Sequence, residues 1–231
     1  MLRAFLADML NPIVWNIPGN AAKKFYSFSR TEYSSVHDLL IAARKTDSDQ
    51  RASQYLHHLE DEYKHTSIFL NRANKLQKEN GKPAFPHPGS EYEMLFDLLG
   101  EKRFLAFVHL GEKRGCIQFT SYARYFAKKG DEHTASIFNA VLQDEVQHMN
   151  YTYDLLEELC GSKSEARKEL RRARSWEMRR GWMRSGRALT GKLFFLITIS
   201  IYPLFLPYKM LYLLAPARAR SKGWKNDAGT N

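Results

Sequence analysis

Two copies of one short motif carry residue types that bind metal ions. Residues 61–65 read DEYKH and residues 144–148 read DEVQH, so both follow the pattern D-E-x-x-H. Positions three apart share one face of a helix, and each motif therefore offers a carboxylate and an imidazole to a common point. Two such motifs facing each other across a helical bundle could hold a pair of metal ions, provided that two further carboxylates complete the site.

Hairpin geometry predicts where those two carboxylates lie. In an antiparallel pair of helices, residues equidistant from the turn are level along the axis. The first turn, near Asp47, reflects Glu62 onto Glu32. The second turn, near Lys128 and Lys129 just before Gly130, reflects Glu145 onto Glu112. A lone E-x-x-H is common by chance, but two copies with level glutamates are not. The predicted metal ligands, which would also be the catalytic residues, are Glu32, Glu62, His65, Glu112, Glu145 and His148.

Over residues 29–159 the chain resembles the ferritin-like di-iron carboxylate superfamily, which includes ferritins, rubrerythrins, the ribonucleotide reductase small subunit and demethoxyubiquinone hydroxylase. In that superfamily, glutamates on the first and third helices and E-x-x-H motifs on the second and fourth bind two irons. The resemblance implies an all-α fold, a four-helix bundle with one crossover connection. The contexts of Glu32 (RTEYSS) and Glu112 (LGEKRG) lack the glycine and alanine typical of the quinone hydroxylase. The resemblance therefore implies its chemistry and not its substrate.

Carboxylate oxygens combined with two imidazoles suit iron or manganese. The expected cofactor is a pair of iron ions, with manganese or a mixed iron and manganese pair as the alternatives. Asp61 and Asp144 lie slightly off the ligand face, where each can accept an N–H from the histidine of the opposite motif and fix its tautomer. The alternative for each aspartate is an exposed partner of a nearby lysine or arginine.

Further histidines lie near the motifs, namely His57, His58, His109 and His133. His109 precedes Glu112 by three residues on the same helix face, which makes it a candidate seventh ligand. A histidine satisfied by hydrogen bonds within the bundle is the favoured interpretation.

Long helices are expected to position these residues. Turn and capping residues in TDSD at 46–49 separate the first two helices, and three prolines with two glycines make 81–90 a connector. The expected bundle helices cover residues 29–44, about 49–80 and roughly 132–159, together with a third helix that ends at about Lys128. Ser90 and Glu93 fit a capping box, and the apolar stretch that follows leads into this third helix, with Gly100 as the candidate break. The expected domains are an amphipathic segment at 1–28, the di-iron bundle at 29–160, a basic linker or helix at 161–192 and a hydrophobic membrane-associated tail at 193–231.

The net charge of +10 is concentrated near the C-terminus, because residues 161–192 hold 11 Lys/Arg against 3 Asp/Glu. Trp176 and Trp182 lie among these basic residues, a pattern that also suits RNA. The apolar run that follows, 193–215, favours a membrane interface over nucleic acid. Pro203 and Pro207 interrupt that run, so a re-entrant or in-plane segment is expected. A hydrophobic helix packed within an oligomer is the alternative.

Two cysteines are too few for a disulfide framework and indicate a reducing compartment. Asp8 interrupts the apolar N-terminus, which therefore reads poorly as a secretory signal. No G-x-G-x-x-G fingerprint is present, so electrons are expected from an external donor. We expect a membrane-associated protein with its site on the cytoplasmic side.

The function expected from these features is that of a non-haem di-iron oxygenase, a hydroxylase or a desaturase, which uses dioxygen on a lipophilic substrate such as a quinone, a fatty acyl chain or a lipid. Membrane lipid would be its partner through the C-terminal tail. Two alternatives are an iron-handling ferroxidase or peroxidase and a non-catalytic membrane-bound scaffold. The first is less favoured because the chain has no C-x-x-C iron domain and ferritin cages carry no such tail.

Overall fold

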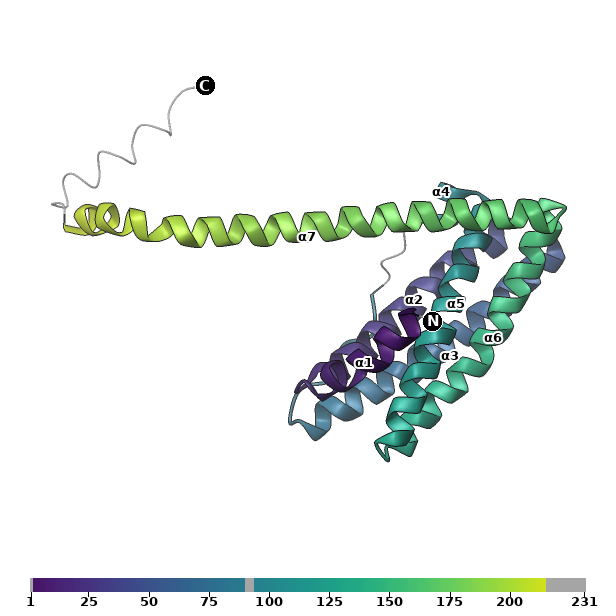
Figure 1. The fold of residues 1–231 in the computed structure, drawn as a ribbon, viewed down its shortest axis with the longest axis horizontal. Helices are drawn as coiled ribbons and strands as arrows, with labels where there is room; N and C mark the ends of the chain where they lie inside the picture. Colours follow the sequence, from purple (N-terminus) through teal and green to yellow (C-terminus); the bar gives the residue numbers. More distant parts are fainter. Residues whose placement is uncertain (1, 90–93, 215–231) are drawn as a thin grey trace, which may run out of the picture. The chain divides into compact units, whose positions relative to one another are not determined.

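A computed structural model describes residues 2–89 and 94–214, and the described residues contain helices, turns and an extended connector but no strand. The expectation of an all-α protein is confirmed. The helices are α1 (Leu2–Asn16), α2 (Asn20–Lys45), α3 (Asp49–Glu79), α4 (Leu95–Leu99), α5 (Glu101–Lys128), α6 (Glu132–Cys160) and α7 (Lys163–Leu214) (Figure 1). Contacts divide the chain into two compact units, Met1–Trp176 and Glu177–Asn231.

Helices α2 and α3 form the first hairpin of the first unit. Helix α2 begins earlier than its sequence pattern indicated, directly after Gly19, which adopts the left-handed conformation at φ 73°. The additional turns are held by burial of Phe25. Helix α3 starts after the N-cap Ser48, whose hydroxyl accepts the backbone N–H of Arg51 at 3.3 Å. The predicted turn between the first two helices is therefore confirmed.

Helices α5 and α6 form the second hairpin. The predicted break at Gly100 separates α4 from α5, and φ there is 71°. Asp131 caps α6 by accepting the backbone N–H of Thr134 at 3.0 Å, and the helix ends before Gly161. The capping pair that the sequence suggested at Ser90 and Glu93 lies outside the described residues.

Within the first unit, α2 packs on α3, α5 packs on α6, and α3 touches α6 (Figure 1). Helix α1 lies against α5 and α2. Its Trp15 is 4% exposed and contacts Phe25 and Tyr122, with ring centroids 5.5 and 5.1 Å apart. The first part of the expected segment 1–28 is thus a helix docked on this unit through an aromatic anchor, whereas residues 20–28 belong to α2.

Two apolar clusters fill the interior of the first unit. The upper cluster contains Leu39, Tyr55, Phe104, Leu105 and Leu156, among others. The lower cluster contains Phe25, Phe69, Phe119, Phe138 and Val141, among others. On α2, α3 and α5, the predicted ligand glutamate lies seven residues, about two helical turns, from an apolar residue of each cluster. On α6, Glu145 lies seven residues after Phe138 of the lower cluster and ten before Leu155 of the upper one. The four glutamates therefore form a polar layer between two apolar ones.

Helix α7 contributes to both units. Its first turns belong to the first unit, where Ala166 and Ala173 are buried in the upper cluster. The sequence had placed this part of the chain in a linker that began at residue 161. The division between the units falls after Trp176, whose ring packs edge-on against Phe107 with centroids 5.8 Å apart.

The second unit contains the rest of α7, from Glu177 onward. Its helix exposes large apolar side chains, including Trp182 at 77% and Phe195 at 61%. The helical backbone continues through Pro203 and Pro207, so the interruption expected at these prolines is absent from the described helix. Side chains beyond residue 200 and all of 215–231 lie outside the description, and with them most of the expected membrane-associated tail. In the part of the chain that is described, no helix combines the length and the apolar character needed to cross a membrane.

Candidate metal centre

Four glutamates, one from each of α2, α3, α5 and α6, meet between the two apolar clusters. These carboxyls lie close enough to shift one another's pKa, Glu32 with Glu62 and Glu112 with Glu145. Glu62 is 1% exposed and Glu145 2%. The structure thus brings together the four carboxylates that the hairpin geometry selected.

The two motif histidines join this layer, each fixed from behind by an aspartate of the facing helix. His65 Nε2 lies 3.0 Å from Asp144 Oδ2, and His148 Nε2 lies 3.3 Å from Asp61 Oδ2. The pairs cross between α3 and α6, as the sequence suggested. Each aspartate can accept the Nε2 proton, which leaves Nδ1 without a proton and free to act as a ligand. Asp61 also accepts a hydrogen bond from Lys64 at 2.8 Å. This aspartate therefore has both expected partners, the histidine and a nearby lysine.

The atoms that face the centre of the layer lack the partners that buried polar atoms normally have. His148 Nδ1 lies 3.6 Å and His65 Nδ1 3.9 Å from Glu62 Oε1. Neither nitrogen, nor Glu62 Oε2, has a hydrogen-bond partner in the described part of the chain. Because unsatisfied buried polar atoms cost free energy, a cation bound among these atoms would satisfy all three. The residues present therefore fit a metal ion.

Donor atoms in this layer form two overlapping groups, within each of which the atoms lie no more than 4.8 Å apart. The first group is His58, Glu62, Glu112 and His148. The second group is Glu62, His65 and Glu145. Buried histidines and glutamates could thus hold metal at two adjoining positions that share Glu62. Glu32 lies near Glu62, whose pKa it raises, but belongs to neither group.

His58 and Tyr151 belong to this layer although neither was among the predicted ligands. His58 Nε2 lies 3.0 Å from Glu62 Oε1, and His58 Nδ1 lies 2.7 Å from the hydroxyl oxygen of Tyr151. A signal was present in the sequence, since His58 precedes Glu62 by one helical turn. His109, by contrast, pairs with the carbonyl of Met149 at 2.9 Å, as expected for a histidine satisfied within the protein.

Burial sets the protonation of the layer. Desolvation raises the pKa of Glu62 and of Glu145 well above the usual range, and the neighbouring carboxyls add to the effect. Burial raises the pKa of Glu112 to about 8. Burial also lowers the pKa of His148 to about 4 despite Asp61. Without metal, the layer therefore holds protons on its carboxyls and keeps the imidazoles of His58 and His148 neutral, so metal binding must release protons.

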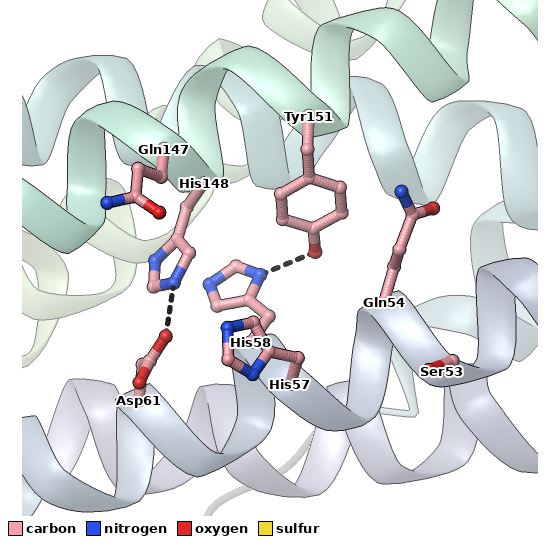
Figure 2. Close-up of a pocket in the computed structure, with 8 residues that line it drawn as sticks. All are labelled: Ser53, Gln54, His57, His58, Asp61, Gln147, His148 and Tyr151. Atoms are coloured by element: carbon pink, nitrogen blue, oxygen red, sulfur yellow. Dashed lines mark hydrogen bonds and ion pairs between the residues drawn. The ribbon is translucent and has the colours of Figure 1, made fainter.

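A cavity of about 340 Å³ adjoins the layer between α3 and α6 (Figure 2). Figure 2 shows the rings of His58, His148 and Tyr151, which line the cavity, pointing toward one another. Its wall also includes Ser53, Gln54, His57, Asp61 and Gln147. The cavity gives a small molecule access to the histidine side of the layer.

Comparisons of the chain with protein-family models, curated proteins and solved structures find no match. The interpretation of the site therefore rests on its own geometry.

Proposed function

We propose that the protein is a non-haem di-iron oxygenase in which α2, α3, α5 and α6 form a ferritin-like four-helix bundle with one crossover connection. The observation that carries this proposal is the buried layer of four glutamates and two aspartate-fixed histidines, with three unpartnered donor atoms facing its centre. Iron is the favoured metal because the donors are carboxylate oxygens and imidazoles, and manganese is the alternative. The connector between α3 and α5 would run the length of such a bundle, because α3 ends beside the lower cluster and α5 begins beside the upper one.

The chain's own residues prepare the site in three ways. Asp61 and Asp144 orient the imidazoles of His148 and His65, which keeps Nδ1 of each aimed at the carboxylates. The two apolar clusters shield the layer from bulk water along the helices. The carboxyls give up protons as they become ligands. When bound, a pair of iron ions would supply the activation of dioxygen.

The substrate class that we propose is lipophilic: a quinone, a fatty acyl chain or a lipid, to be hydroxylated or desaturated. The second unit supports a lipophilic substrate, because it exposes Trp182, Leu193 and Phe195 in a segment that is rich in arginine. Such a segment suits the surface of an anionic membrane, with the site on the cytoplasmic side. An external electron donor completes the reaction, and nucleic acid is not favoured as a partner.

The test is to load the protein with iron anaerobically, reduce it, and measure the metal content and the uptake of dioxygen. Two irons per chain, and uptake of dioxygen that the Glu62→Ala, Glu145→Ala double variant lacks, are expected. Substrate screening with quinones and acyl lipids would follow. Iron bound without any uptake of dioxygen would contradict the oxygenase and favour the membrane-bound scaffold.

A further inference from the structure

We propose that His58 is a seventh metal ligand and that it makes the two metal positions chemically unequal. This inference rests on the proposed two-metal site and adds a residue that the ferritin-like pattern of four glutamates and two histidines does not contain.

The position of His58 suits a metal ligand. Its side chain is 1% exposed. Its Nε2 lies 3.0 Å from Glu62 Oε1 and 3.7 Å from Glu112 Oε1, so it faces carboxylates of α3 and α5 at once. Its Nδ1 lies 2.7 Å from the Tyr151 hydroxyl on α6. The imidazole is therefore fixed on one side and presented to the glutamate layer on the other.

The same arrangement recurs at the two motif histidines. One ring nitrogen of His65 and one of His148 contact an aspartate oxygen of the facing helix, and the other nitrogen points at glutamates. An oxygen behind the ring is the usual means by which a protein orients a metal-binding histidine. Tyr151 takes this place for His58, whose ring stacks on that of His148 with centroids 3.7 Å apart.

The seventh ligand divides the site into unlike halves. One position has two imidazoles, from His58 and His148, with Glu62 and Glu112. The other has one imidazole, from His65, with Glu62 and Glu145. The cavity borders the first half, because His58 and His148 line it and His65 does not. A small molecule that enters the cavity would therefore meet the nitrogen-rich position first.

The competing role for His58 is that of a hydrogen-bond partner which only orients Glu62. The substitution His58→Gln separates the two roles, since a glutamine amide can still donate to a carboxylate but is a poor ligand for Co²⁺. His133→Gln is the matched control, because His133 is exposed on α6 and lies outside the cavity lining.

The experiment is a Co²⁺ titration of the metal-free full-length chain, followed by visible absorption and by equilibrium dialysis. The wild type and His133→Gln are expected to bind two ions per chain. His58→Gln is expected to bind one tightly and to weaken the other by more than about 100-fold, with altered absorption bands. Tyr151→Phe is expected to weaken the same ion by about 10-fold, the smaller loss typical of an outer partner. Far-ultraviolet circular dichroism checks that each variant is folded.

Two results would overturn the inference, and only the second would also overturn the proposed function. Two ions bound by His58→Gln with wild-type affinity and absorption would remove His58 from the ligand set while leaving the two-metal site intact. A wild-type chain that binds no Co²⁺ and no Fe²⁺ would overturn this inference together with the proposed function.

Discussion

Gly115 lies so close to the glutamate layer that a single methyl group tests the position of Glu145. A Cβ at residue 115 would lie 3.1 Å from Glu145 Oε2, which is tighter than ordinary packing. Because Glu145 is buried, its carboxylate would have to shift by a few tenths of an ångström. We expect Gly115→Ala to weaken metal binding by about 10-fold, comparable to the loss of an outer partner.

Gly111→Ala is the control for that variant. The nearest atom to a Cβ there is Arg114 Nη2 at 3.9 Å, an ordinary contact. Both substitutions are expected to favour the helix by about 0.5–1 kcal/mol. Isothermal titration with Fe²⁺ or Co²⁺ separates them, and equal affinities in the two variants would show that Glu145 does not bind metal in the position described.

Protonation of the layer predicts how the stability of the metal-free protein depends on pH. Burial raises the pKa of Glu112 to about 8, so the folded state keeps a proton that the unfolded chain loses near its ordinary pKa. A carboxyl with a raised pKa stabilises the fold at low pH and loses that contribution as the pH rises through the folded value. His58 and His148 act in the opposite direction below about pH 6.5, because burial lowers the pKa of each.

Above about pH 6.5, only the raised pKa values of the buried carboxyls still change the free energy of unfolding with pH. Urea unfolding of the metal-free protein should therefore give a free energy of unfolding that falls between about pH 6.5 and 8. Glu112→Gln should reduce the slope. A stability that is constant or rises over this range would contradict the protonated layer.

N-cap hydrogen bonds fix where the two helices that carry the D-E-x-x-H motifs begin. Ser48 caps α3 with one hydrogen bond. Asp131 caps α6 and also accepts from Arg72 at 3.1 Å, and Arg72 is 9% exposed. Ser48→Ala is expected to cost about 1 kcal/mol of unfolding free energy. Asp131→Ala should cost more, because it also leaves the guanidinium without its carboxylate. Urea unfolding at pH 7 measures both, and equal costs would contradict a structural role for the Arg72 pair.

Much of this architecture could be predicted from the sequence because local chemistry determines it. Turn residues at 46–49 and around Gly130 placed both hairpins, and their geometry then selected Glu32 and Glu112. The early start of α2 was missed, since it depends on burial of Phe25 against Phe69 and Phe138, which are distant from it in the sequence. His58 was named but not chosen for a similar reason. Its role depends on Tyr151, a residue on another helix.

On the scale of the whole molecule, every residue of the glutamate layer lies in the first unit, Met1–Trp176. A chain ending at Trp176 should therefore bind the same number of metal ions as the full chain, while losing the attachment to anionic vesicles that we propose for the second unit. Metal analysis and vesicle sedimentation measure the two properties separately. Loss of metal from the shortened chain would show that the second unit contributes to the site.

The central claim is that the buried glutamate layer holds two metal ions that share Glu62. The most direct measurement is anomalous X-ray diffraction, at the iron absorption edge, from crystals of the iron-loaded protein. Two peaks are expected, one on each side of the Glu62 carboxylate, with His148 near one and His65 near the other. A loaded crystal with no peak in the layer, or with peaks only at the protein surface, would contradict it.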